Sequence, residues 1–453
     1  MPTYYVNPDS LTGGNGTTDA TTGDNRAFHS LADWEAARQG VLAATETVIC
    51  ATNGTADEHA VVINGWTTYA DRYVDIQVAA GSRHAGVLNT AKYLLSVTND
   101  APLKIQEDYV RVDGIQVQVL SPTEARHVVT VEAITATNND IRLSNCIVKS
   151  HGGATYASHG VMLYDTDIIA KIWNCIIYNV PTPSGAAGIY TSCASVSIYS
   201  CVVIGGQRGI NSYGAVTVKN TYVGGAGYED FGYVSGTLAK TNCASEDASA
   251  DDTETGETQS NCLINKALDI DTFVNVTAGS EDFHLAADGL SPLQGTGVDT
   301  TGDSAPLNFT TDIDGQTRDA TWDIGADAHV SSGQSLAGLA ALSTGTVVAQ
   351  AIAAGAVALA GSAGLSTWTL LTQALVSVEL LAQSAIRWRI DDADEATATW
   401  AAVENAGLSA AAGTKRLRVQ VNHTGDPAAI TPKWQYRRKP SGGAWGDWTT
   451  VGS

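Results

Sequence analysis

The chain has 453 residues and is acidic, with 47 Asp and Glu side chains against 25 Lys and Arg and a formal net charge of −22 at pH 7. This charge excludes binding to nucleic acid by neutralisation of phosphates, and it opposes attraction to anionic lipid. The length allows two or three domains, and 45 Gly with only 11 Pro indicate many turns without Pro-rich disorder.

The N-terminal residues and the cysteines argue against export and against cysteine chemistry. Residues 1–7 contain neither the basic segment nor the apolar segment that begins a secretory signal. The seven cysteines are an odd number, and no two of them form a C-x-x-C pair. We therefore expect assembly in the cytoplasm of the producing cell, no disulfide framework, no metal and no other cofactor.

One motif recurs through much of residues 1–330. Each copy is a short strand of alternating apolar residues, then a small polar residue, then Cys or Thr, then a second apolar pair, as in Lys171–Ile177. Counted at the Cys-equivalent position from Ile115 onward, the copies are 19–31 residues apart, which is the period of a solenoid. The repeated polar and Cys or Thr positions are Asn145, Cys146, Asn174, Cys175, Cys201, Asn220, Thr221, Asn242, Cys243, Asn261 and Cys262.

This repeat predicts a coil that advances by one strand spacing, about 4.8 Å, per turn, so that like side chains stack in ladders. Asn tolerates the left-handed backbone of a tight bend, and its amide can bridge successive turns. Cys is small and apolar, so it suits the narrow interior beside the bend. We therefore interpret the five ladder cysteines as core side chains rather than as metal ligands or redox groups.

The pattern resembles the right-handed parallel β-helix superfamily, which includes pectate-lyase-like enzymes, phage tailspikes and other virion proteins. Residues 4–37 resemble the first strand and capping helix of such domains, with Ser30 and Asp33 as a capping box. Residues 283–326 resemble the terminal rung. The resemblance implies a mainly β fold in which residues 1–330 form a right-handed parallel β-helix with an N-terminal capping helix, and it says little about activity.

A change of composition marks the next segment. Residues 328–378 carry no Asp, Glu, Lys or Arg, and Leu336–Gln350 recurs as Leu359–Gln373 with nine of fifteen positions identical. Gln, Ser, Thr and Gly interrupt the apolar residues, so we expect no membrane insertion. We interpret residues 331–385 as a low-complexity stem or linker, rich in Ala, Gly, Ser and Thr, that packs against copies of itself. The resemblance to phage fibres implies a homotrimer.

Residues 386–453 hold five of the ten tryptophans, and their alternating apolar runs are separated by Gly, Asn and Pro. These features predict a small antiparallel β-sandwich, which resembles the immunoglobulin-like (Ig-like) C-terminal modules of phage structural proteins. One of its faces could bind a sugar or a protein, and the alternative is a solvated sheet face.

Two carboxylates are weak catalytic candidates. Asp165 and Asp167 would share one face if they lay on a strand, and a carboxylate pair can cleave a glycosidic bond. His151, His159 and Lys171 are nearby in sequence. Acidic residues are plentiful in this chain and these two lie where a turn is expected, so a role in the turn is the stronger interpretation.

Other acidic segments are ambiguous in the same way. Glu229 and Asp230 form a second pair, and residues 244–259 contain six carboxylates and no basic residue. The run could collect calcium, but a solvated loop between the Cys243 and Cys262 turns explains it as well. Asp312–Gly315 resembles the start of a calcium loop without the Glu that such a loop requires later.

These features together predict a non-enzymatic structural protein of a bacteriophage or prophage virion, either a head fibre or decoration protein or a tail fibre. Its β-helix would be displayed for attachment to the host surface or its glycans, and its partners would be other virion proteins and a host glycan. The first alternative is a polysaccharide lyase or glycoside hydrolase, a depolymerase built on the same β-helix. The second is a secreted adhesin, against which the missing export signal speaks.

Overall fold

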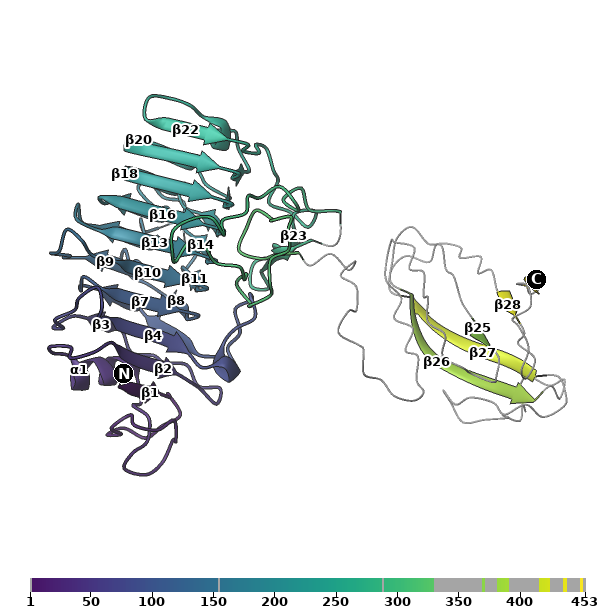
Figure 1. Ribbon diagram of the computed structural model, residues 1–453, viewed down its shortest axis with the longest axis horizontal. Coiled ribbons are helices and arrows are strands. Elements are labelled where there is room, and N and C mark those ends of the chain that lie inside the picture. The colour runs from purple at the N-terminus through teal and green to yellow at the C-terminus, as the bar shows by residue number, and fades with distance from the viewer. Residues whose placement is uncertain are drawn as a thin grey trace. The chain divides into compact units, whose positions relative to one another are not determined.

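A computed structural model describes residues 2–153, 155–286 and 289–329, together with five strands within residues 369–450. The chain divides into two compact units, Met1–Ser331 and Ser332–Ser453. The first unit is a coil of parallel strands with three faces, here called A, B and C (Figure 1). This sheet system fits the right-handed parallel β-helix expected from the sequence.

Successive turns of the coil place strands on face A, then on face B, then on face C. Face A contains β1 (Thr3–Val6), β2 (Glu46–Cys50), β4 (Val74–Val78), β7 (Val110–Asp113), β10 (Ile141–Ser144), β13 (Ile169–Trp173) and β16 (Ser195–Tyr199). Face B contains β5 (Leu94–Thr98), β8 (Gln116–Leu120), β11 (Ile147–Lys149), β14 (Ile176–Val180), β17 (Val202–Gly205), β19 (Tyr222–Gly224) and β21 (Ala244–Ser245). Face C contains β3 (Val61–Ile63), β6 (Leu103–Ile105), β9 (Val129–Glu132), β12 (His159–Tyr164) and β15 (Ala187–Ser192). In the last turns, the long strands β18 (Arg208–Lys219) and β20 (Glu229–Thr241) run through faces C and A, and β22 (Glu257–Ser260) pairs with β20.

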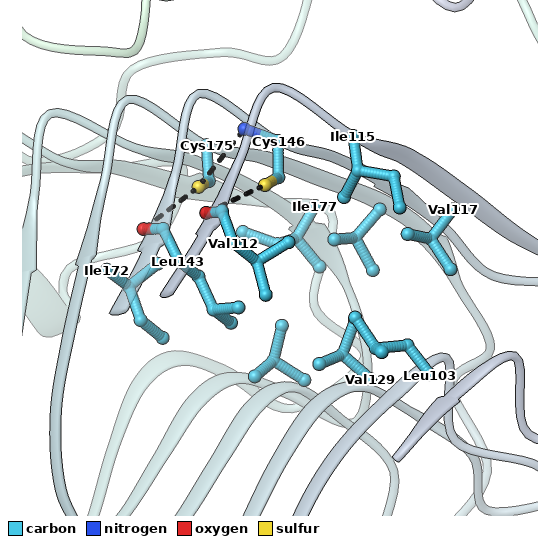
Figure 2. A pocket seen from close by; sticks show the side chains of 12 residues that line it. Leu103, Val112, Ile115, Val117, Val129, Leu143, Cys146, Ile172, Cys175 and Ile177 are labelled. Atoms are coloured by element: carbon cyan, nitrogen blue, oxygen red, sulfur yellow. Dashed lines mark hydrogen bonds between the residues drawn. The ribbon is translucent and has the colours of Figure 1, made fainter. Parts of the chain in front are cut away.

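The interior of the coil is a closed apolar core. Leu143 on β10 is in register with Ile172 on β13, which is in register with Ile198 on β16, and all three side chains are buried. The void between the faces measures only about 10 Å³, room for at most one water molecule (Figure 2). At its edge the thiols of Cys146 and Cys175 donate hydrogen bonds to backbone carbonyls. At this void, side chains fill the interior and leave no room for a ligand larger than water.

From Asn145 onward, each bend between faces A and B is made by one residue in the left-handed conformation. The backbone φ at these bends is 48–53°, and the residues concerned are Asn145, Asn174, Ser200, Asn220, Asn242 and Asn261. The next residue points into the core, where Cys146, Cys175, Cys201, Thr221 and Cys243 are buried and Cys262, in the last turn, is partly exposed. Burial raises the pKa of Cys146, Cys175 and Cys243, which keeps these thiols protonated and unreactive.

Residues 283–326 do not form a terminal rung, so that expectation is wrong. The coil ends near Leu263, which bridges to Ala244, and residues 264–329 then run back along the outside of face B (Figure 1). This return segment contains the antiparallel pair β23 (Phe273–Asn275) and β24 (Asp282–Leu285). Face B presents an outward apolar row that must be covered, and the return segment buries it. The packed residues are Ile147, Ile176, Val202, Tyr222 and Ala244 from face B, with Phe273, Phe283, Leu293, Ile313 and Ile324 from the return segment.

The ladder asparagines hold the return segment. Asn220 donates from Nδ2 to the carbonyl of Val298 (2.7 Å) and accepts the Val298 N–H (2.8 Å). Asn242 and Asn174 donate in the same way to Thr296 (2.7 Å) and Thr311 (2.8 Å). Bridging between successive turns, which the sequence predicts for these amides, occurs between Asn174 and Asn145 (3.2 Å). Their second function, docking a distant segment, was not predicted.

Both ends of the coil are closed by local structure. The helix α1 (Leu31–Arg38) covers the first turns, and Ser30 accepts the N–H of Asp33 in the expected cap. At the other end the short helix η2 (Ser249–Asp251) buries Ala250 against the last turn. A second short helix, η1 (Ala80–Ser82), follows β4.

The acidic run of residues 244–259 is therefore more than a solvated loop. Its Glu257 forms a buried ion pair with Lys240 (3.1 Å), and the Lys240 ammonium also donates to the Ser249 carbonyl. Asp247 accepts the backbone N–H groups of Ser249 and Asp230. These contacts fix the loop that closes the coil.

In the second unit β26 (Leu381–Ile390) pairs antiparallel with β27 (Lys415–His423), and β28 (Gln435–Arg437) pairs antiparallel with β25 (Thr369–Leu370) and β29 (Thr449–Thr450). The other residues of the expected stem and Ig-like sandwich lie outside the described residues, so both remain predictions, as does the trimer. Among the described residues, no helix is both long and apolar enough to span a bilayer.

We predict that Asn220 contributes to stability through both its conformation and its amide. Asn220→Gly keeps the left-handed bend and loses two hydrogen bonds, which should lower the free energy of unfolding by about 1–3 kcal/mol. Asn220→Ala should cost about 1–2 kcal/mol more, because a Cβ is strained at this φ. Urea unfolding followed by tryptophan fluorescence measures both values.

The matched control is Asn261→Gly, in the same conformation but exposed at the last turn. It should unfold within about 0.5 kcal/mol of wild type. If Asn220→Gly proves as stable as wild type, the amide contacts to the return segment do not contribute.

Candidate ligand-binding face

The weak catalytic candidates Asp165 and Asp167 lie in a turn and not on one strand face. β12 ends at Tyr164 and β13 begins at Ile169. Asp165 uses its carboxylate to accept the N–H of Asp167 (3.2 Å), and the Asp167 carbonyl accepts from Asn139 (2.6 Å). The spacing of two residues therefore reflects a turn, which is the stronger of the two interpretations of this pair.

The basic residues near this pair in sequence are engaged elsewhere. Lys171 forms an ion pair with Asp140 (2.6 Å), and His151 is hydrogen-bonded to Ser158 (3.1 Å). His159 is buried in an aromatic stack. These contacts pair Lys171, His151 and His159 with groups other than the carboxylates of Asp165 and Asp167.

The second acidic pair also has structural partners. Glu229 forms an ion pair with Arg208 (3.2 Å), and Asp230 exchanges backbone and side-chain hydrogen bonds with Asp247. Burial raises the pKa of Asp230 to about 7, and the negative charge of the neighbouring Asp247 carboxylate adds to this increase. Asp230 is almost fully buried, so it cannot meet a polymer at the surface.

The outer surface of face C carries a cluster of three tyrosines, two of them exposed and one half-buried. Tyr164, Tyr190 and Tyr213 lie on the neighbouring strands β12, β15 and β18. Their ring centroids are 6.3 Å apart for Tyr164 and Tyr190 and 5.4 Å apart for Tyr190 and Tyr213. Tyr164 is 58% exposed, Tyr213 is 38% exposed and Tyr190 between them is half-buried, so the tyrosine cluster forms an accessible aromatic surface on the sheet.

Two stacked histidines extend this cluster toward the start of the coil. The ring of His159 lies 4.9 Å from that of Tyr190 and 4.6 Å from that of His127. Each histidine Nδ1 accepts a backbone N–H from the next turn, His127 from His159 (3.1 Å) and His159 from Ala187 (3.0 Å). Both rings must therefore be neutral, with Nδ1 unprotonated, to accept these hydrogen bonds. The His159 ring, held by these hydrogen bonds, packs against the Tyr190 ring and limits its movement.

A buried polar atom lies in the same surface row. Asn211 is directly across from Tyr190, which is directly across from Met162, so the three side chains share one face of the sheet. Asn211 is 5% exposed, and its Oδ1 accepts no hydrogen bond within the described part of the chain. A buried acceptor without a donor is costly, and a ligand hydroxyl would satisfy it.

Charged groups border the cluster rather than interrupt it. Lys104 pairs with Glu132 on one side (3.1 Å), and Arg208 pairs with Glu229 on the other. Arg208 also lies over the ring of Tyr228 (5.2 Å), which is 70% exposed. The resulting surface has an uncharged aromatic centre with a polar rim, a common anatomy of binding sites.

A separate polar groove of about 440 Å³ lies at the corner between faces C and A. It is lined by Asn64, Thr68, Gln106, Glu107 and Asp108, among others. Burial raises the pKa of Glu107 to about 7, and the neighbouring carboxylates of Asp108 and Glu35 add to the effect. A carboxyl group that is close to half protonated at neutral pH therefore lines this groove.

Sequence reasoning missed the tyrosine cluster, although a signal for it was present. Tyr164, Tyr190 and Tyr213 are 26 and 23 residues apart, which is the period of the coil. The Asn and Cys ladder covers only the positions beside the bend, so it does not include these tyrosines. A search for any residue type that recurs with the rung period would have found the tyrosines.

No protein-family model matches the sequence, and no curated protein matches it. Among solved structures, the chain is similar to the crystal structure of pectate lyase Pel9A, with 13% sequence identity and a TM-score of 0.36. That match covers 72% of this chain and 96% of the other chain. So weak a likeness carries no argument about activity, and the β-helix assignment rests on the strand pairing described above.

The histidine stack predicts a loss of stability in acid. Burial lowers the pKa of His127 to about 4 and that of His159 to about 3. Repulsion from the neighbouring His127 ring also lowers the pKa of His159. Below pH 6.5 the histidines of the unfolded chain take up protons, whereas those of the folded chain stay neutral. The stability of the folded state is therefore highest above pH 6.5 with respect to these groups, and it declines as the pH falls toward 4. We expect His159 alone to account for roughly 2–3 kcal/mol of that decline.

The variant His159→Asn keeps an acceptor for the Ala187 N–H and removes the titrating ring. It should be less stable than wild type at pH 7.5, because the aromatic stack is lost, and should lose less stability between pH 6.5 and pH 4. Urea midpoints measured across this range give both quantities. Equal pH slopes for the two proteins would contradict the prediction.

Proposed function

We propose that this chain is a non-enzymatic structural protein of a phage or prophage virion, in which the β-helix binds a glycan of the host surface through the tyrosine cluster on face C. The observation that carries the proposal is the open group of three tyrosines, Tyr164, Tyr190 and Tyr213, on adjacent strands of one rigid sheet. A head fibre, a decoration protein and a tail fibre all fit this function.

The chemistry of the cluster matches that of a sugar chain. A pyranose ring presents apolar C–H groups on its faces and hydroxyl groups at its edges, and tyrosine combines an apolar ring with a polar tip. The unpartnered Oδ1 of Asn211 supports the proposal because it can accept a sugar hydroxyl. The rings are held by strand pairing and by the histidine stack, so little conformational entropy is lost when a ligand binds.

The virion assignment draws on the repeated uncharged segment and on the resemblance of the coil and C-terminal module to phage proteins. Face B is already covered by the return segment, and the interior is closed. Face C is therefore available for display in the first unit. A displayed rigid solenoid needs no catalytic residues to attach a particle to a surface.

The polysaccharide depolymerase is kept as a second candidate because of the polar groove. Glycosidases use one carboxylic acid that is protonated near neutral pH and one ionised carboxylate. Glu107 has the raised pKa, and Asp108 lies beside it. Both carboxyl groups also accept backbone N–H groups, Glu107 from Trp66 (2.6 Å) and Asp108 from Thr135 (2.9 Å), which is a structural function that competes with catalysis.

The tyrosine cluster predicts which substitutions remove glycan binding. On an array of bacterial surface glycans, Tyr190→Ala should weaken binding at least tenfold, because it removes the central ring, whereas Tyr190→Phe should lose much less. The matched control is Tyr69→Ala, an exposed tyrosine on a turn outside the cluster. If Tyr190→Ala and Tyr69→Ala bind the array like wild type, face C is not the binding surface.

The same glycans separate the two candidate functions. Release of reducing ends by wild type, abolished in Glu107→Gln and retained in Tyr190→Ala, would establish the depolymerase and overturn the non-enzymatic proposal. Binding without release of ends supports attachment.

The virion assignment predicts a visible loss from the particle. Electron microscopy of particles assembled without this chain should show missing density at the head or tail, and antibodies against residues 1–331 should decorate wild-type particles at that place. Intact density together with unlabelled wild-type particles would remove the virion assignment.

A further inference from the structure

Three potential metal ligands meet in the return segment, although the sequence led us to expect no metal. His284 lies on β24, and Asp314 and Asp327 lie 30 and 43 residues further along the chain. One donor atom from each lies within 4.8 Å of the other two. A calcium-loop motif is local, because it requires a later Glu within one loop, whereas these donors come from three separate parts of the return segment.

The histidine is oriented as a metal-binding histidine would be. Its Nδ1 is hydrogen-bonded to Asp282 (2.5 Å), which leaves Nε2 directed toward Asp314. Metal-bound histidines almost always donate their other ring N–H to a carboxylate or carbonyl in this way. Nε2 and the Asp314 Oδ2 are 3.6 Å apart, slightly beyond a hydrogen bond. A tetrahedral ion with bonds of about 2.1 Å places neighbouring donors about 3.4 Å apart, so the spacing suits an ion between them.

The charge and hydrogen bonding of the cluster favour binding of a cation. Asp314 Oδ1 is buried and accepts no hydrogen bond within the described residues. Asp282, Asp314 and Asp327 surround His284, and Asp312 lies beside Asp314. Among the described residues, His284 is the cationic side chain that pairs with Asp314, and the buried guanidinium of Arg318 lies near Asp312 and Asp327. Crowded carboxylates repel one another unless a cation or a proton is shared between them. A divalent ion would neutralise two of these charges.

We propose that His284, Asp314 and Asp327 bind a divalent transition-metal ion, with zinc as the best match, and that the ion fastens β24 to the loops at residues 312–314 and 325–328. Zinc accepts imidazole nitrogen together with carboxylate oxygen, whereas calcium and magnesium prefer oxygen ligands alone. Asp282 is a positioning residue that acts through the His284 ring. The site is independent of the glycan-binding proposal.

The experiment uses the full chain, stripped with EDTA and dialysed against zinc. Mass spectrometry of bound metal should find about one zinc per chain, and cobalt as a substitute should give the visible absorption of a tetrahedral site. Zinc at about 100 times its Kd should raise Tm by roughly 5 °C over the EDTA-treated protein. Both effects should vanish in Asp314→Asn and Asp327→Asn.

Two further variants make the pattern specific. Asp282→Asn should weaken zinc binding about 10–100-fold without abolishing it, as expected for a residue that only orients a ligand. The matched control Asp319→Asn, in the same segment, should bind zinc like wild type, because its carboxylate accepts hydrogen bonds from Thr321 instead.

The competing explanation is that a protonated His284 holds the carboxylates together without any metal. In that case wild type retains no zinc, cobalt gives only an octahedral spectrum, and His284→Gln lowers Tm equally in zinc and in EDTA. Any of these results overturns the proposal, as does a Tm increase produced by calcium but not by zinc. The metal content and cobalt spectrum of the wild-type chain decide the question even if a variant fails to fold.

Discussion

The first unit depends on one backbone constraint, the left-handed bend that joins face A to face B in every turn from Asn145 onward. The bend is short, so the strand residues next to it keep the same register from one turn to the next. It also sets the direction of each neighbouring side chain. The bend residue points outward, the next residue points into the core, and the residue after that points outward on face B. The inner Cys ladder, the outer Asn contacts and the apolar row beneath the return segment all follow from this alternation.

The period and the core positions of the coil could be predicted from the sequence because both are local. A strand, a bend and a second strand fit within seven residues, and the copies differ mainly in the loops between them. The return segment could not be predicted in this way, because Asn220 bonds to Val298 and Asn174 to Thr311 across 78 and 137 residues. One local signal was nevertheless present. The apolar pair after each bend has one member, such as Ile176, that points outward, so face B had to be covered by something.

The candidate sites also differ in whether their residues are close together or far apart in the sequence. Asp165 and Asp167 looked like a catalytic pair because their spacing of two suits a strand, but a spacing of two equally suits a turn in which one carboxylate accepts the N–H of the other. The tyrosine cluster and the His284 cluster are assembled across turns or across the return segment. Consecutive members are 13–30 residues apart in sequence, so no short motif contains either cluster.

The extent of the tyrosine cluster limits how it could hold a glycan. The row through Tyr164 begins beside Glu132, and after Tyr213 a shift of register places Ser235 opposite it on β20. The aromatic surface therefore covers three strands, or about 10 Å across the sheet. A patch of this size contacts a short stretch of a polymer, which gives modest affinity for one site. Stable attachment would then require several copies of the chain to bind the same surface at once, because linked sites raise the effective concentration of one another. A repeated position on a particle would provide those copies, so the small size of the site favours the display function over the capture of a soluble ligand.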